Sequence, residues 1–453
     1  MKTVKDSLGE ITIEETALYG ASTARAKINF KIGDQLMPLQ QIYSIALVKK
    51  ACALSNRDCQ KLSNEKCQYI VSACDDILNG VVDDQFVLSM YQSGSGTQSN
   101  MNVNEVIAGL SHHKLHPNDD VNMSQSTNDV FPTAMHLTTL RLFLENLLPA
   151  LDRVIASLQS FENKTNTIFK VGRTHLQDAI SLSVAQEFSG YRSTLEDNKQ
   201  LLLNASESLK KLAIGGTAVG TGLNTHPEYL RFVELHLEKL TGLKLNVFVN
   251  KFHQLSMKDG MTHFHHTLAL LASNWIKIAN DIRFLGSGPR AGLKELILPS
   301  NEPGSSIMPG KINPTQWEAM IMLCVKVLGN DTVMSFSNSM GNFELNVMMP
   351  LMIDTMIESI SLLTDGMNSF VDHLLNDLQV NNDTLKQYNE QTLMNAAALN
   401  PKLGYDIVSK CVLEAHQKKV SLKEVVLQKG LLSSEEYDSI MNIERLVYQD
   451  VKE

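Results

Sequence analysis

The sequence predicts a mostly α protein whose central part is a bundle of long helices. The first observation is the spacing of its twelve prolines. None of them lies within residues 150–226 or 228–288, whereas five lie within residues 289–314. A proline inside a helix costs about 3 kcal/mol, so the two proline-free stretches permit long helices. The proline-rich stretch that follows them must be a loop.

The second observation is an apolar repeat in the second proline-free stretch. Apolar residues recur there at alternating steps of three and four, which is the spacing of a heptad seam. The eight positions are Met261, Phe264, Leu268, Leu271, Trp275, Ile278, Ile282 and Leu285.

The third observation is a stretch that is nearly free of charge. Between Ala319 and Ser339 the only charged residues are Lys326 and Asp331, so this helix should lie inside a bundle. A membrane-spanning helix is the weaker interpretation, because residues 329–331 (Gly-Asn-Asp) interrupt the apolar run.

Further helices are expected, in chain order, near residues 38–54, 132–160, 177–212 and 343–369, with a kink at Pro350. We expect a three-part chain: an N-terminal helical domain (1–123), a central long-helix bundle (124–381) and a small C-terminal helical domain (382–453). Seams of this length usually pack against partner helices, so the chain should self-associate.

Composition excludes several classes of function. The 453 residues are 43% hydrophobic and 20% charged, which is typical of a globular protein. A net charge of −9 disfavours nucleic acid and anionic membranes as partners, so an anionic ligand would need a local cationic or N–H site. The six cysteines form no C-x-x-C pair, which argues against a metal cluster and favours reduced core residues. No signal or transit segment is evident at the start, so we expect a cytoplasmic protein.

Two polar clusters precede expected helices. Residues 93–100 (SGSGTQSN) combine glycines, hydroxyls and amides, and residues 124–129 (SQSTND) repeat the hydroxyl and amide content. Glycines let a backbone approach a ligand, and a helix N-terminus offers free N–H groups to an anion. Ordinary helix capping explains each cluster equally well when it is taken alone.

Two further clusters contain titratable groups. Residues 172–178 (GRTHLQD) precede the stretch to Leu212 and add an imidazole, the usual equipment of a general acid or base. Residues 304–314 (GSSIMPGKINP) form a proline-bracketed loop with two hydroxyls and one lysine, followed by Glu318. A lysine there can neutralise a carboxylate or an enolate-like charge, so we favour function over a plain surface loop.

Competing motifs lack essential parts. The glycine-rich residues 215–222 have no phosphate-loop lysine and follow a helical stretch, so they do not support nucleotide binding. The histidine groups at 112–116 and 263–266 have no acidic partner at a recognisable metal-ligand spacing. No G-x-S-x-G segment supports a Ser-His-Asp hydrolase.

Residues 304–313 resemble the signature loop of the aspartase/fumarase superfamily, G-S-S-x-M-P-x-K-x-N. Within it, the chain most resembles class II fumarate hydratases, essentially from end to end. His175 favours the fumarases, because aspartate ammonia-lyases usually carry glutamine there. The resemblance is carried by residues 95–105 (SGTQSNMNVNE), 116–122 (HPNDDVN), 172–179 (GRTHLQDA), 215–229 (GGTAVGTGLNTHPEY) and 341–347 (GNFELNV), together with 250–252 and 301–303.

The resemblance implies a lyase of the tricarboxylic acid cycle that reversibly hydrates fumarate to (S)-malate by anti addition, through a carbanion. It also implies a homotetramer with a helical core, in which three subunits form each site. Ser95 and Thr97 would come from one subunit, Thr174 and His175 from another, and residues 305–313 from a third. No metal or organic cofactor is implied.

The resemblance also assigns roles to individual residues. Ser305 would be the base, Lys311 and Asn313 would stabilise the charge on the carboxylate, and His175 with Glu318 would handle the water. Substrate oxygens would be held by Ser95, Thr97, Ser126, Thr127, Asn128, Thr174, Ser306 and Asn313. A secondary dicarboxylate site would include His116, Asn118 and Asp119.

Three departures from the fumarase pattern accompany this resemblance. The chain is shorter by roughly a dozen residues between Ala108 and His116, which puts the secondary site in doubt. Met123 replaces a common lysine, and residues 126–128 (STN) are closer to the aspartase pattern. The alternatives are therefore an aspartate ammonia-lyase, which His175 opposes, and a non-catalytic structural homologue, which the retained catalytic set opposes.

Overall fold

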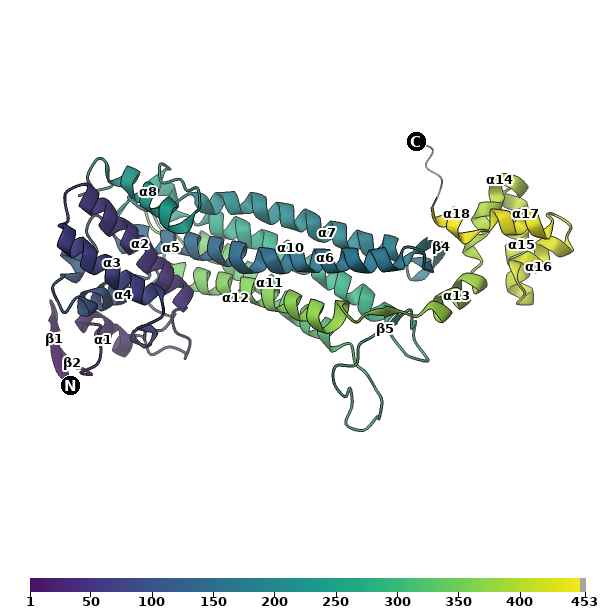
Figure 1. The fold of residues 1–453 in the computed structure, drawn as a ribbon, viewed down its shortest axis with the longest axis horizontal. Coiled ribbons are helices and arrows are strands. Elements are labelled where there is room, and N and C mark those ends of the chain that lie inside the picture. The colour runs from purple at the N-terminus through teal and green to yellow at the C-terminus, as the bar shows by residue number, and fades with distance from the viewer. Residues whose placement is uncertain (449–453) are drawn as a thin grey trace. The chain divides into compact units, whose positions relative to one another are not determined.

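The computed structural model describes residues 1–448 and contains mainly helices (Figure 1). The chain forms two compact units that alternate along the sequence. Unit 1 contains Met1–Pro149, Asn198–Ser273 and Leu323–Thr364, and unit 2 contains Ala150–Asp197, Asn274–Met322 and the described residues from Asp365 onward. The three-part domain division stays a prediction.

Eighteen α-helices are found in residues 1–448, and the prediction of a mostly α chain is confirmed. They are α1 (Ala21–Asn29), α2 (Leu39–Asp58), α3 (Asn64–Leu78), α4 (Thr97–Leu110), α5 (Thr127–Leu142), α6 (Leu148–Thr165), α7 (Val184–Ser206), α8 (Tyr229–Thr241), α9 (Lys251–Ser256), α10 (Asp259–Leu285), α11 (Thr315–Ser339), α12 (Met349–Phe370), α13 (Asn382–Gln391), α14 (Asn400–Leu403), α15 (Tyr405–Lys418), α16 (Leu422–Gln428), α17 (Ser434–Ile440) and α18 (Ile443–Val447).

Three antiparallel two-stranded sheets complete the described residues. They pair β1 (Lys2–Asp6) with β2 (Gly9–Ile13), β3 (Phe169–Thr174) with β4 (Gln177–Ser183), and β5 (Leu296–Ile297) with β6 (Gln379–Val380).

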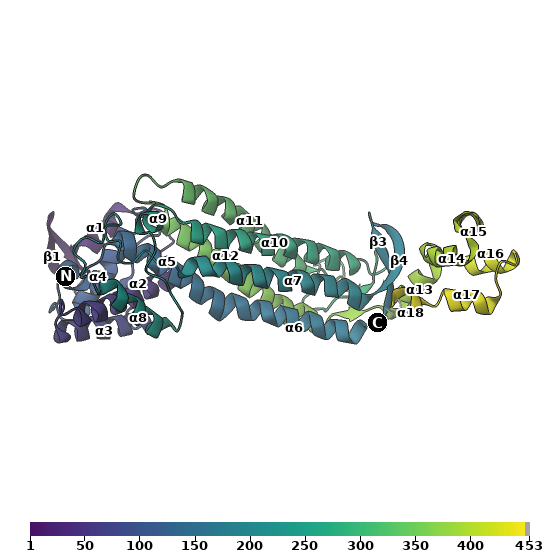
Figure 2. The same cartoon turned by 90° about the horizontal axis from the view of Figure 1, so that it is seen from above.

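The heptad seam predicted for residues 261–285 is confirmed. All eight seam positions lie in α10 and are at most 7% exposed. In unit 1 the ring of Phe264 packs edge-on against Phe143 at 5.2 Å between centroids. In unit 2 the indole of Trp275 packs edge-on against Phe370 at 5.1 Å. Figure 2 shows α10 as one continuous helix.

Two predicted helix limits and one predicted kink are wrong. A helix was expected from residue 177, but residues 169–183 form the β3–β4 hairpin and α7 begins at Val184. Pro132 lies inside α5, which begins five residues earlier at a Ser126 cap. Pro350 is the second residue of α12, where its missing N–H has no helical partner to lose, so it produces no kink.

Helix α11, which the sequence predicts to lie inside a bundle, is buried on one face only in the single chain. Cys324 and Val327 are fully buried, but Met322, Val325 and Phe336 are 66%, 56% and 68% exposed. Among the described residues, α11 is also the one helix that is long and apolar enough to cross a membrane. One such helix is weak evidence, since core helices of globular proteins meet the same criterion.

All six cysteines are buried free thiols, as the sequence predicted for core residues. Burial raises the pKa of the Cys52 thiol to about 12, so this side chain stays protonated and apolar near neutral pH.

Candidate active site

The first polar cluster forms the N-terminus of α4 in unit 1. Gly96 is the N-terminal cap, with a φ of 75° that glycine adopts without strain. A Cβ at Gly96 would lie 2.3 Å from the Phe131 ring. The hydroxyls of Ser95 and Thr97 lie 2.8 Å apart and share a hydrogen bond. The glycine therefore brings two hydroxyls and a helix N-terminus close to α5.

The second cluster forms the N-terminus of α5, also in unit 1. The Ser126 hydroxyl accepts a hydrogen bond from the Asn128 N–H at 3.2 Å, and the Asp129 carboxylate accepts one from the Ser126 N–H at 2.9 Å. This reciprocal pair is a capping box, which leaves Thr127 at the first helical position. The Asn128 amide donates to the Ala218 carbonyl at 2.8 Å.

Asp129 is the last residue of the second cluster and is not among the predicted site residues. Its carboxylate is fully buried and accepts hydrogen bonds from the N–H groups of Gly215 and Thr217, both at 2.9 Å. Burial raises the pKa of this carboxyl, while the backbone donors oppose the shift. The glycine-rich segment 215–222 thus binds a carboxylate of its own chain. The signal in the sequence was the spacing of Ser126 and Asp129, which matches a capping box.

A half-buried amide, that of Asn122, connects the two clusters. Asn122 Oδ1 accepts from the Lys49 ammonium at 2.6 Å and from the Asn100 amide of α4 at 3.3 Å, while the Asn122 amide donates to Gln125 O at 3.3 Å. Burial lowers the pKa of Lys49 to about 8. The structure thus brings the first two clusters together within unit 1.

The residues predicted for the secondary site lie on an exposed π-turn of unit 1. His116 Nδ1 accepts from the Asp119 N–H at 3.0 Å, and the two side chains are 56% and 83% exposed. Asn118 is also exposed. Below them the buried Asp120 pairs with Lys66 at 2.7 Å, which fixes the turn to α3.

The third cluster lies at the tip of the β3–β4 hairpin in unit 2, and not at a helix start as the sequence analysis expected. His175 and Leu176 form the two-residue turn, with φ angles of 56° and 59°. A left-handed backbone costs a non-glycine residue roughly 1 to 2 kcal/mol. Thr174 and His175 are exposed, so the hairpin presents them outward. Alternating apolar residues in Phe169–Ser183 were the signal for strands.

The fourth cluster is a loop in unit 2 that is closed at its base. Gly304 N–H donates to Lys311 O at 2.9 Å, and the Asn313 amide donates to Gly304 O at 2.6 Å. A Cβ at Gly304 would lie 2.5 Å from Lys311 O, so this closure requires glycine. The loop encloses a hollow of about 380 Å³ that Ser305 and Lys311 line.

The Ser305 hydroxyl is the best-defined chemical group of this loop. Its Oγ accepts hydrogen bonds from the N–H groups of Ile307 at 3.3 Å and Met308 at 3.1 Å. Two backbone donors aimed at one oxygen stabilise negative charge that develops on it. Ser306 and Lys311 are exposed on the same loop.

Glu318 lies in the first turn of α11, directly after this loop. Its side chain is exposed. Within the described part of the chain, no hydrogen bond joins Glu318 to His175, although the resemblance pairs them. The Glu318 carboxylate and the His175 imidazole are therefore both accessible for contacts outside this chain.

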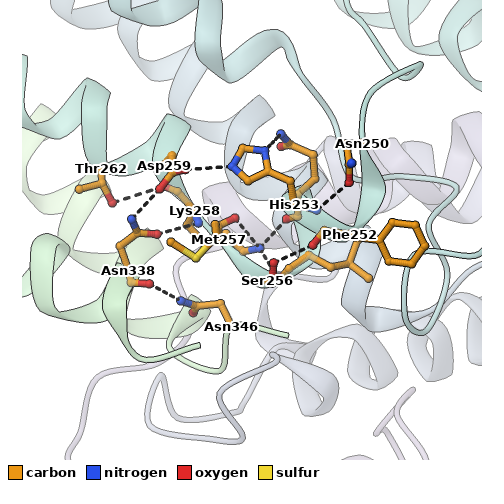
Figure 3. A network of polar contacts seen from close by, with 12 residues as sticks. Asn250, Phe252, His253, Ser256, Met257, Lys258, Asp259, Thr262, Asn338 and Asn346 are labelled. Carbon is orange, nitrogen blue, oxygen red and sulfur yellow. Dashed lines mark hydrogen bonds and ion pairs between the residues drawn. The ribbon is translucent and has the colours of Figure 1, made fainter. Parts of the chain in front are cut away.

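A polar network joins two of the stretches that carry the family resemblance (Figure 3). The Lys258 ammonium donates to the carbonyls of Gln254 at 2.6 Å and Leu255 at 2.9 Å, at the end of α9. Asn346, in the 341–347 stretch, donates its N–H to Leu255 O at 3.1 Å. Burial lowers the pKa of Lys258 to about 7, and the ammonium donates to backbone carbonyls, which is a structural role.

Comparison with known proteins agrees with this arrangement. The family described as Lyase matches residues 9–329, and the family described as Fumarase C C-terminus matches residues 396–448. The class II fumarate hydratase of Bacillus subtilis is 45% identical over 452 residues, which covers 98% of both chains. The chain belongs to the class II fumarase family of lyases. The resemblance inferred from the sequence is thereby confirmed.

Two further relatives extend the agreement to the fold. The class II fumarate hydratase of Helicobacter pylori (strain J99) is 47% identical and also covers 98% of both chains. A crystal structure of class II fumarase from Schistosoma mansoni superposes with a TM-score of 0.96 at 37% identity, covering 99% of each chain. The fumarase fold thus extends over 99% of the chain.

Proposed function

We propose that this protein catalyses the reversible hydration of fumarate to (S)-malate, a step of the tricarboxylic acid cycle. The observation that carries the proposal is the identity of 45% to 47% with class II fumarate hydratases over 98% of both chains. A small dicarboxylate is the substrate. The aspartate ammonia-lyase alternative is not favoured, since the matched relatives are hydratases and His175 is retained.

In the proposed mechanism Ser305 is the base. Dehydration of malate begins with loss of a C3 proton, which leaves a carbanion delocalised into the neighbouring carboxylate. The N–H groups of Ile307 and Met308 favour the alkoxide of Ser305 that removes this proton. Lys311 and Asn313 stabilise the charge on the carboxylate, and His175 with Glu318 protonates the departing hydroxyl.

The remaining site residues hold the substrate oxygens. The N-terminus of α4 supplies Ser95 and Thr97, the N-terminus of α5 supplies residues 126–128, and Thr174 and Ser306 complete the set. Each helix N-terminus also carries the positive end of a helix dipole, which suits a carboxylate. His116, Asn118 and Asp119 are proposed as a secondary dicarboxylate site. The proposed chemistry needs no metal or organic cofactor.

We propose a homotetramer in which three subunits complete each site. The exposed apolar face of α11 supports this, because Met322, Val325 and Phe336 would be covered by partner helices. The cytoplasmic location stays a prediction.

An absorbance assay tests the reaction. Purified protein should consume fumarate, seen as loss of its ultraviolet band, in buffer free of ammonia, and malate should form in equal amount. A strict requirement for ammonia would identify the lyase instead, and no turnover in either buffer would identify a non-catalytic homologue.

A further inference from the structure

A buried ion-pair network lies beneath the hairpin that carries His175. Glu295 Oε2 lies 3.0 Å from Lys170 Nζ, and Glu295 Oε1 lies 2.5 Å from Arg173 Nη1. Lys170 also pairs with Glu187 at 2.7 Å, so two cations and two carboxylates balance each other. The side chains of Glu295 and Lys170 are only 2% and 3% exposed. Solvent therefore screens these pairs weakly.

The backbone of Glu295 is held by hydrogen bonds on both sides within unit 2. Its N–H donates to the Leu285 carbonyl at the end of α10, and its carbonyl accepts from the Asn381 N–H, both at 2.9 Å. The next two residues form β5, which pairs with β6. The carboxylate is thus presented from a backbone that is fixed on both sides.

Arg173 is the last residue of β3 before the turn whose side chain is not exposed. Thr174, His175 and Leu176 are exposed, and so are Gln177 and Asp178 on the returning strand. The other side-chain anchors of the hairpin lie at its base, where Asn389 donates to Phe169 O at 2.8 Å. The Arg173 guanidinium also lies 5.9 Å from the centre of the Tyr388 ring. The Glu295–Arg173 pair therefore holds the part of the hairpin nearest His175.

We infer that Glu295 is a positioning residue for His175, acting through Arg173, an inference that rests on the proposed function. Glu295 contacts the hairpin through Lys170 and Arg173. Its carboxylate attracts the guanidinium one residue before Thr174 by charge, which limits the movement of the strained two-residue turn. A proton-transfer group displaced by about 1 Å can lose up to a hundredfold in rate, whereas a substrate-binding group chiefly affects KM.

Steady-state kinetics of Glu295→Gln test this inference. The substitution keeps the shape of the side chain and removes its charge. It should lower kcat for malate dehydration by about ten- to a hundredfold, while KM changes by less than about threefold. Arg173→Met should give the same loss, and it leaves Glu295 paired with Lys170, so it avoids an unpaired buried carboxylate. Normal kcat in either folded variant would overturn the inference.

A matched control is available in the same unit. Glu162 is buried and pairs with Arg192 Nε at 2.8 Å, so this ion pair joins α6 to α7. Both Glu162→Gln and Glu295→Gln should lower the melting temperature. Glu162→Gln should leave kcat unchanged. An equal loss of kcat in this control would show that losing any buried ion pair has the same effect, and would overturn the specific role of Glu295.

A double-mutant cycle separates this inference from the proposed function. If Glu295 acts through His175, adding Glu295→Gln to His175→Asn should lower kcat by less than about twofold further. Losses that multiply would overturn the inference while leaving fumarate hydration intact. Failure of the wild-type protein to hydrate fumarate would instead overturn the proposed function.

Discussion

At the scale of single residues, Ser305 is the group on which the proposed chemistry depends most. Ser305→Ala should lower kcat by roughly a hundredfold or more, because it removes the proposed base. The assembled particle should stay intact, since the side chain is not part of a packed core. Steady-state kinetics together with size-exclusion chromatography check both expectations. Near-normal turnover would remove Ser305 from its role.

Lys311 should contribute charge rather than proton transfer. Lys311→Met should weaken stabilisation of the developing carboxylate charge, by about 3 kcal/mol if the closed site excludes water. The measurement is kcat/KM for malate with the variant beside the wild type. A kcat/KM within about threefold of the wild type would contradict this role.

At the scale of secondary-structure elements, Gly96 decides how α4 begins. Gly96→Ala should destabilise the protein and lower fumarate turnover, since its Cβ would meet the Phe131 ring at 2.3 Å in a left-handed conformation. The matched control is Gly190→Ala inside α7, where no atom lies within 4 Å of the added Cβ. The control should be neutral or stabilising by up to about 1 kcal/mol. Thermal unfolding of both variants measures the difference, and equal stabilities would contradict the packing argument.

Some secondary-structure elements could be predicted from the sequence and others could not. The heptad spacing of 261–285 was decisive, because all eight positions face the protein interior. The β3–β4 hairpin was missed, because a proline-free stretch permits a helix without requiring one. Its turn uses His175 and Leu176, and neither residue signals a two-residue hairpin turn, which usually contains glycine or asparagine.

Site residues that lie close together in the sequence could be predicted, whereas contacts that form only in the tertiary structure could not. Ser305 and Lys311 share one short loop, so their proximity followed from the sequence. The contacts of Asp129 with residues 215–217, and of Glu295 with Arg173, join segments more than eighty residues apart. A single sequence gives no information on such pairs.

At the scale of the whole molecule, the proposed tetramer makes the apolar face of α11 an interface. Val325→Glu should break the assembly into smaller species and abolish turnover, because a charge replaces a side chain that partner helices would cover. Light scattering with an activity assay measures both effects. A stable tetramer with normal activity would place the interface elsewhere.

The most direct test mixes two inactive proteins. Ser305→Ala and His175→Asn subunits, dissociated and reassembled together at equal amounts, should recover roughly a quarter of the wild-type fumarate hydration, because each site then draws its two groups from independent chains. Each variant reassembled alone is the control. Full reassembly into mixed tetramers with no recovered activity would contradict the shared site.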